Sequence, residues 1–187
     1  KPIVKAAQKL AMPALALTDQ MNFCGLVRFY STAHEAGIKP IIGVDCWVQH
    51  PLFAGESSRM LLLAADNTGY QNLSQLISKA YLRGHVDGKP QIEHDWLAEF
   101  SQGVIILSGA KDGLVGKALL KENGQSLNEL LQFYQHYFAQ RFYLEITRTG
   151  RPDEELYIQK AVTLAEQHDL PLVATNEVVF LQAEDFP

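Results

Sequence analysis

The segments 15–19 (LALTD) and 41–45 (IIGVD) each run from apolar residues into a carboxylate, and segments 61–66 (LLLAAD) and 172–177 (LVATNE) repeat the pattern. Short apolar runs bounded by turn residues are typical of strands buried on both faces. Barrel-type α/β proteins place their chemistry at the carboxyl ends of such strands. These four segments therefore predict an α/β fold with acidic groups gathered at one end of its strands.

Strands and helices are expected to alternate along the whole chain. Apolar runs predict strands over 14–18, 40–48, 59–65, 103–108, 141–146 and 171–175. Helical periodicity predicts helices over 2–11, 24–36, 69–82, 94–99, 112–121, 126–138 and from about 152 to 168. Such alternation indicates a parallel sheet with right-handed crossovers, either open and doubly wound or closed into a barrel. Polar residues after nearly every strand favour the barrel, because an open sheet gathers ligand groups mainly at one switch point.

Two local features refine this arrangement. The link around residues 55–58 (GESS) is short and polar, so the strands at 40–48 and 59–65 are predicted to be antiparallel neighbours. Either Asn67 or Thr68 is expected to cap the helix at 69–82, since short polar side chains satisfy the free amides of a first helical turn.

The composition limits the functional classes. With 187 residues, 47% hydrophobic and 20% charged, we expect a single globular domain over residues 1–187. The net charge of -5 argues against autonomous binding to a nucleic-acid backbone, which needs clustered Lys and Arg. Two isolated cysteines, Cys24 and Cys46, are typical of reduced thiols in a cytoplasmic protein. No apolar run reaches the roughly 20 residues of a membrane span, so no membrane association is expected.

Asp19 and Asp45 are the best candidates for metal ligands, because each is predicted to follow a strand and both could face one mouth. The alternative is that they cap the following helix or bind backbone amides. The neighbouring Gln20 is a poor ligand for first-row metals. Among the six histidines, His85 has the best prospect of facing a pocket, whereas His34 lies late in a predicted helix.

Nucleophilic and phosphate-binding chemistry have little support in the sequence. Ser108-Gly109 follows a predicted strand, but it does not form a G-x-S-x-G elbow. The glycines at 109, 113 and 116 match neither a dinucleotide fingerprint nor a Walker motif.

Six segments carry a resemblance to a known family. They are 12–19 (MPALALTD), 37–43 (GIKPIIG), 67–73 (NTGYQNL), 77–80 (ISKA), 149–154 (TGRPDE) and 173–176 (VATN). In order and spacing they closely resemble the PHP (polymerase and histidinol phosphatase) domain of the catalytic alpha subunits of bacterial DNA polymerase III. The resemblance covers essentially the whole chain. It implies a distorted (β/α)7 barrel of PHP type, here expected to be truncated at both ends.

Catalytic members of that superfamily resemble phosphoesterases with a trinuclear metal centre built from histidines and acids. This sequence departs from their pattern at five positions: Gln20, Tyr81, Ala110 and Val179 stand where histidine or cysteine ligands are common, and Asp45 stands where glutamate is common. By resemblance, a His-x-His motif would precede Lys1 and an Asp-x-His motif would follow Phe186. With so many ligands replaced, the metal site is expected not to be intact, leaving Asp19 and Asp45 as vestigial ligands.

The resemblance implies three further expectations. The domain is expected to be catalytically inactive, to scaffold the polymerase domains that follow in the full chain, and to dock the proofreading exonuclease (epsilon) subunit. DNA would be reached only through the full-length enzyme, a DNA-directed DNA polymerase (a nucleotidyltransferase) of DNA replication. No cofactor is expected within these residues, and magnesium would belong to the polymerase domain. The alternative is a residual metal-dependent phosphoesterase, pyrophosphatase or 3′–5′ exonuclease using Asp19 and Asp45. A metabolic barrel hydrolase is disfavoured because the sequence lacks an intact histidine cluster.

Overall fold

The strands and helices follow the predicted alternation closely. The computed structural model describes residues 2–176, 178–181 and 184. Its strands are β1 (Ala14–Leu17), β2 (Lys39–Gln49), β3 (Ser58–Ala64), β4 (His85–Val86), β5 (Lys89–Pro90), β6 (Ile92–Glu93), β7 (Val104–Leu107), β8 (Phe142–Ile146) and β9 (Leu172–Ala174). Its α-helices are α1 (Pro2–Lys9), α2 (Leu26–Glu35), α3 (Asn67–Arg83), α4 (Trp96–Glu99), α5 (Leu114–Leu120), α6 (Gly124–Tyr137) and α7 (Glu154–His168). Two 3₁₀ turns, η1 (Pro51–Phe53) and η2 (Ala110–Asp112), complete the elements.

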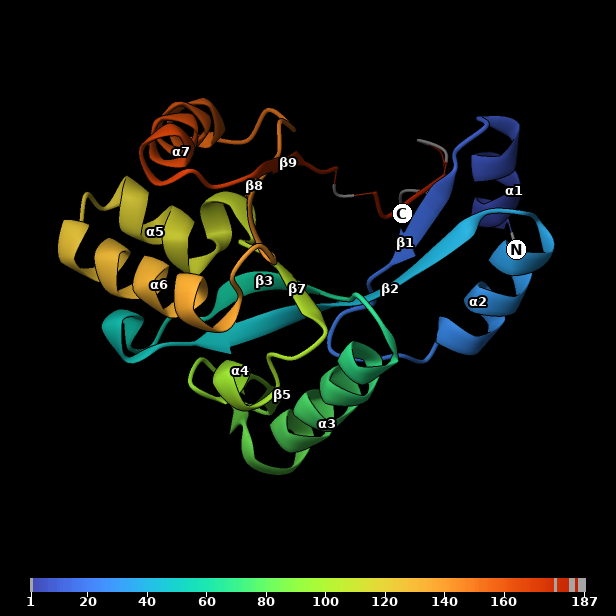
Figure 1. Cartoon of the computed structure of the whole chain (residues 1–187), viewed down its shortest axis with the longest axis horizontal. Coiled ribbons are helices and arrows are strands. Elements are labelled where there is room, and N and C mark those ends of the chain that lie inside the picture. Colours follow the sequence, from blue (N-terminus) through green and yellow to red (C-terminus); the bar gives the residue numbers. More distant parts are fainter. Residues whose placement is uncertain (1, 177, 182–183, 185–187) are drawn as a thin grey trace.

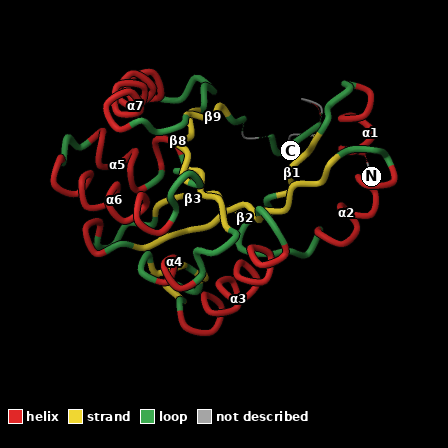
Figure 2. The backbone as a smooth tube through the Cα atoms, in the orientation of Figure 1, coloured by secondary structure: helices red, strands yellow, loops and turns green. Residues whose placement is uncertain are grey.

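The main sheet runs in the order β1-β2-β3-β7-β8-β9, with β6 added beside β2. Neighbouring strands are parallel except at β3, which is antiparallel to both β2 and β7. The predicted hairpin between β2 and β3 is therefore confirmed, and the sheet is mixed because of this one reversed strand. Figure 1 shows the sheet curled, with the helices outside the curve and with β1 and β9 on opposite sides of an opening. The architecture is a curled half-barrel, as Figure 2 also shows in the arc of its strands.

The register assigns alternate residues to the two faces of the curled sheet. Val44, Leu62 and Ile106 are fully buried on its outer face. They pack with Leu73 of α3, Leu114 of α5, Leu130 of α6 and Tyr157 of α7 in one continuous core. A smaller core joins α1 and α2 to β1 and β2 through Val4, Ala7, Phe29, Ala33 and Ile38. The helices thus cover the outer face, and the concave inner face carries Asp45 among apolar side chains such as Leu61 and Leu107.

The start of α3 differs from its predicted cap. Asp66 is the N-cap residue: its backbone is extended and its Oδ1 accepts a hydrogen bond from the Gly69 amide at 2.8 Å. Asn67 and Thr68 instead lie inside the helix, because the strand ends one residue earlier than predicted and the first polar side chain reaches the free amides. A Cβ on Gly69 would lie 1.8 Å from the Gly103 carbonyl oxygen, so only glycine allows this close approach.

No helix in the described part of the chain is both long enough and apolar enough to cross a membrane.

Candidate functional site at the barrel mouth

Asp45 lies on the inner face of the sheet, but its local setting differs from the prediction. It lies within β2, inside the strand predicted over 40–48, and not after a strand as a ligand at the mouth was expected to lie. On the adjacent strand, Arg59 reaches diagonally across, and its Nε–H donates to both carboxylate oxygens of Asp45 at 3.1 and 3.0 Å. The two side chains are only 17% (Asp45) and 19% (Arg59) exposed. The strongest candidate ligand is therefore held by a guanidinium in a largely dry setting.

The backbone of Asp19 is hydrogen-bonded to that of Asp45. The Asp45 amide donates to the Asp19 carbonyl at 3.2 Å, and the Met21 amide donates to the Asp45 carbonyl at 2.9 Å. These bonds extend the parallel pairing of β1 and β2 past the end of β1. The Asp19 carboxylate faces Gly25 at the start of α2, where a Cβ would lie 2.9 Å from Oδ2. The N-cap residue of α2 is Gly25, which makes no side-chain capping hydrogen bond of its own.

Glu145 on β8 is a buried acid at the same end of the sheet, 3% exposed. Its Oε2 accepts the Gly109 amide at 3.1 Å, and its Oε1 accepts the Thr175 hydroxyl. The backbone amide of Glu145 donates to Ser108 Oγ at 3.0 Å, and the Tyr157 hydroxyl donates to its carbonyl at 2.8 Å. Each of these contacts joins Glu145 to a segment that follows another strand or to α7. The carboxylate thus ties together the ends of β7, β8 and β9.

Burial of the Tyr157 hydroxyl shows how dry this region is. Removal from water, opposed in part by Ser108, raises the pKa of Tyr157 to about 12, because a phenolate is poorly solvated inside the protein. The hydroxyl is therefore a permanent donor at neutral pH. Its hydrogen bond to the Glu145 carbonyl anchors α7 to the mouth.

These donors do not fit a multinuclear metal centre. The carboxylates of Asp45 and Glu145 already serve a guanidinium, an amide and a hydroxyl. Within residues 2–176, 178–181 and 184, no three His, Cys, Asp or Glu side chains are grouped so that they could hold a metal ion. Multinuclear sites need several open oxygen or nitrogen donors around each ion.

The other positions discussed for ligands lie away from a metal arrangement. Tyr81 and His85 are exposed, with their rings 6.3 Å apart on the far end of α3 and the start of β4. His85 had the best prospect of facing a pocket among the histidines, but His50 and His94 are the ones that line the cavity described below. Ala110 is buried beside the Glu145 contacts, and Val179 is 73% exposed. Glu177 falls outside the described residues.

Sequence reasoning missed Arg59 and Glu145 as members of the site. Both signals were present in the strand alternation. Arg59 falls two residues before Leu61, and Leu61 pairs with Asp45, so both belong to the inner face. Glu145 alternates in the same way with Tyr143, which pairs with Leu107. A lone charge within an apolar strand marks an inward polar position when the opposite face is covered by helices.

The comparisons with known proteins agree with this geometry. Residues 1–149 match the PHP domain family. The chain belongs to the PHP domain family. It is 56% identical over 185 residues to the DNA polymerase III subunit alpha of Vibrio cholerae, covering 99% of this chain and 16% of that protein. It is 53% identical over 185 residues to the Escherichia coli K12 subunit, with the same coverage. The Haemophilus influenzae subunit is 55% identical over 186 residues, covering 100% of this chain and 16% of that protein.

Solved structures show the same fold at much lower identity. A Bifidobacterium adolescentis protein described as a metal-dependent phosphoesterase superposes with a TM-score of 0.56 at 13% identity, over 92% of this chain and 79% of that one. An amidohydrolase from Chromobacterium violaceum gives a TM-score of 0.57 at 14% identity, over 93% of this chain and 80% of that one. The PHP-type barrel is therefore shared with hydrolase folds. The chain spans about a sixth of the length of the polymerase subunits that it matches, 16% in each case.

Proposed function

We propose that this PHP domain is a non-hydrolytic structural domain at the N-terminal end of a replicative DNA polymerase III alpha subunit. The observation that carries the proposal is the Arg59–Asp45 pair at the mouth of the half-barrel. A guanidinium neutralises a carboxylate as a cation would. It cannot bind and activate a water molecule, because it has no open coordination position.

The role that remains for the mouth is to hold the fold together. Arg59 joins β3 to β2, and Glu145 joins the segments after β7 and β9 to β8. These contacts stiffen the concave end of the sheet without a metal. A stiff domain is a suitable platform for the polymerase domains of the same chain and for the proofreading exonuclease (epsilon) subunit. DNA would then be contacted by the assembled enzyme in the cytoplasm, since the net charge of -5 gives this domain little attraction for phosphates.

The first experiment tests the absence of hydrolysis on the purified full-length alpha subunit. Metal content after dialysis is measured by mass spectrometry, and release of nucleotides from 3′-labelled single-stranded DNA and of phosphate from pyrophosphate is followed with added Mn²⁺ or Zn²⁺. We expect the PHP domain to retain no metal. We also expect any hydrolysis by the parent to be the same in an Asp19→Asn/Asp45→Asn variant. Retained zinc or manganese together with hydrolysis lost in that variant would establish the rival function, a residual phosphoesterase or exonuclease.

The second experiment tests the docking role. The alpha–epsilon complex is treated with a lysine-reactive cross-linker and analysed by mass spectrometry. Exposed lysines lie on separate elements of this domain, including Lys9 on α1, Lys89 on β5 and Lys121 after α5. We expect at least one of them to be linked to epsilon. Links from epsilon only to later parts of the alpha chain would contradict the docking role.

A further inference from the structure

A cavity lies away from the barrel mouth, where β2 and β6 end side by side. Its volume is about 330 Å³, within the usual range for small-ligand pockets. The walls come from the loop after β2, which includes η1, and from the residues that join β6 to α4. Gln49 and Glu93 pair across the two strands at its base. None of the contacts described at the mouth involves these residues.

Two histidines line this cavity, and one of them is incompletely bonded. His94 is only 2% exposed, and its Nε2 lies 3.2 Å from the hydroxyl of Tyr134. Its Nδ1 is buried and has no hydrogen-bond partner among the described residues. The His50 ring lies edge-on to it, with the ring centroids 4.5 Å apart. An unsatisfied buried nitrogen is costly, so its presence beside a cavity points to a ligand that supplies the missing partner.

Both imidazoles are neutral at physiological pH. Burial, and to a smaller extent the neighbouring His50, lowers the pKa of His94 to about 3. Burial also lowers the pKa of His50, against the opposing effect of the Asp95 and Glu129 carboxylates. The floor of the cavity therefore carries no positive charge. The 3.2 Å contact with Tyr134 fits either tautomer of His94. A ligand that donates a hydrogen bond to Nδ1 selects the tautomer with hydrogen on Nε2, which donates to the Tyr134 oxygen.

The rim of the cavity is acidic. Glu93 and Asp95 are exposed on one side, and the Asp95 side chain is 88% exposed with its Oδ1 3.9 Å from His94 Nδ1. Glu56 also lines the cavity, where Lys121 at 2.8 Å and Lys117 at 3.4 Å hold it. The hydrogen bond and charge of Lys121 lower the pKa of Glu56 and keep it ionised.

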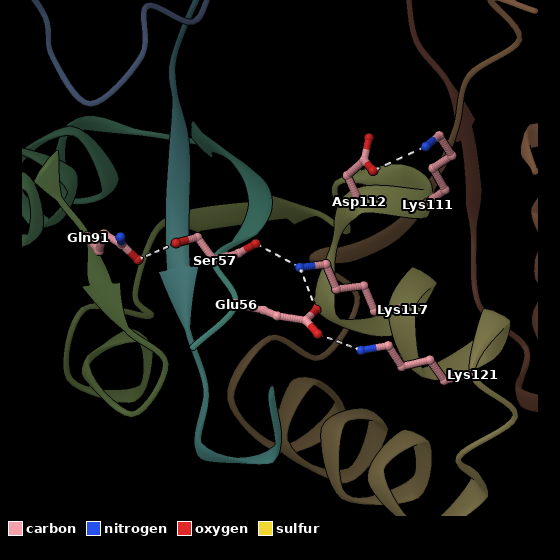
Figure 3. A network of polar contacts seen from close by, with 7 residues as sticks. All are labelled: Glu56, Ser57, Gln91, Lys111, Asp112, Lys117 and Lys121. Carbon is pink, nitrogen blue, oxygen red and sulfur yellow. Dashed lines mark hydrogen bonds and ion pairs between the residues drawn. The ribbon is translucent and has the colours of Figure 1, made fainter. Parts of the chain in front are cut away.

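The wall that carries Glu56 is fixed in place. Figure 3 shows Lys117 and Lys121 of the α5 region converging on Glu56, and Lys117 also donating to the Ser57 carbonyl at 2.7 Å. The Ser57 hydroxyl donates to Gln91 Oε1 at 2.7 Å, which links this loop to the segment before β6. The cavity is thus preformed between two tethered segments, which reduces the ordering cost of binding.

The donors and charges select one class of ligand. A transition metal is disfavoured because His50 Nδ1 accepts the Leu52 amide at 3.1 Å, which places the proton of the neutral ring on Nε2. An anion is disfavoured by the Glu93 and Asp95 carboxylates on the rim. A cation with N–H donors suits all of these groups, since it can donate to His94 Nδ1 and to the rim carboxylates together. The aromatic ring of Phe53 in the same wall already receives the Lys121 ammonium at 5.4 Å.

We propose that the cavity between His50 and His94 binds an organic cation carrying a guanidinium or primary ammonium group. The group comes either from a basic side chain of a protein partner or from a free polyamine. The cation enters past Glu93 and Asp95 and donates a hydrogen bond to His94 Nδ1.

The test uses the full-length alpha subunit and hydrogen exchange of the peptides that cover residues 49–57 and 91–96. The probes are methylguanidinium, spermidine, an acetylated Gly-Arg-Gly amide, and sulfate as the anion control. We expect saturable protection of both peptides by at least one cationic probe. A Glu93→Gln/Asp95→Asn variant is expected to bind at least about threefold more weakly, from the value of two exposed ion pairs. A Glu166→Gln/Asp169→Asn variant, which removes two exposed acids at the end of α7, should bind as the parent does.

The probes also separate the two sources of the cation. Tighter binding of the arginine peptide than of spermidine identifies a protein side chain, and the reverse identifies a free polyamine. Three results would overturn the proposal: no saturable protection by any cationic probe, equal affinity in the Glu93→Gln/Asp95→Asn variant, or protection by sulfate instead of the cations.

Discussion

Replacing Arg59 by glutamine tests whether an internal cation maintains the barrel mouth. In the parent protein the Arg59 Nε–H contacts both oxygens of Asp45 at 3.1 and 3.0 Å. The Arg59→Gln variant keeps a polar side chain of similar width but removes the positive charge. Asp45 then stays as a carboxylate that is only 17% exposed and has lost its guanidinium. The inner face of the sheet loses one side-chain contact between β2 and β3, which stay paired through their backbones.

The size of the effect follows from the burial of the pair. Removing one partner of a fully buried ion pair costs about 3–5 kcal/mol, and exposed pairs contribute about 0–1 kcal/mol. With side-chain exposures of 19% and 17% the pair is partly buried and lies between these two limits. We therefore expect the free energy of local opening of β2 and β3 to fall by about 2 kcal/mol. This corresponds to roughly 30-fold faster exchange of their protected amides.

The assay is hydrogen exchange of the full-length alpha subunit, read on peptides that span 39–49 and 58–64. The matched control is Arg148→Gln, which breaks a similar contact with Glu155 in which the side chains are 70% and 63% exposed. This control should leave the exchange of residues 142–157 within the error of the measurement, because water and salt already screen an exposed pair.

Adding divalent ions tests whether the guanidinium takes the place of a metal ion. If the guanidinium takes the place of a cation, Mn²⁺ should restore part of the lost protection in Arg59→Gln by binding Asp45 and Asp19, and should not protect the parent. Equal exchange rates in Arg59→Gln and Arg148→Gln would refute the reasoning that the mouth depends on this charge.

Two further predictions concern the framework around the site. Glu154 accepts hydrogen bonds from the Thr149 hydroxyl and from three backbone amides, which lowers its pKa from 4.5 to about 2. The pKa of Glu154 is depressed in the folded protein, so its stabilising effect is complete above pH 4.5 and is lost as the pH falls towards 2. Glu154→Gln should therefore make the start of α7 easier for pepsin to cleave at pH 4.5, and the rate of cleavage should change less as the pH is lowered further. A variant whose cleavage shows the same pH profile as the parent would contradict this. Gly69→Ala would place a methyl group 1.8 Å from the Gly103 oxygen and should lower the free energy of the first unfolding transition by at least about 2 kcal/mol. Gly124→Ala places its methyl group where no atom lies within 4 Å, so it should leave that free energy unchanged. Equal melting temperatures of the two alanine variants in calorimetry would contradict this, because they would mean that the backbone at Gly103 moves aside at little cost.

Much of the fold followed from local sequence patterns. The apolar runs at 40–48 and 59–65 predicted β2 and β3 to within a residue or two at each end, and the polar link between them predicted their antiparallel pairing. These features depend on side-chain periodicity and turn chemistry, which act over a few residues. The α3 cap was assigned to the wrong residue because a shift of one position in the end of a strand changes which side chain reaches the free amides.

The site was only partly predictable. Asp19 and Asp45 were expected to face one mouth. The backbone segments that carry them do pair, because β1 and β2 are parallel neighbours. Asp45 nevertheless lies within β2, and the Asp19 carboxylate faces Gly25. Their partners were not predicted. Arg59 contacts Asp45 across 14 residues and Glu145 contacts Thr175 across 30 residues, and no local pattern specifies which charge a distant carboxylate will meet.

By itself the sequence determined the order of strands and helices and the likeness to the PHP domain, since both are set by short-range patterns of side chains. Only the tertiary structure decided that Asp45 is paired with Arg59, that Glu145 bridges three strands, and that His94 lies buried beside a cavity. The physical reason is the curling of the sheet: it brings side chains from separate strands within hydrogen-bonding distance and excludes water from them, and both effects arise only when the whole sheet has formed.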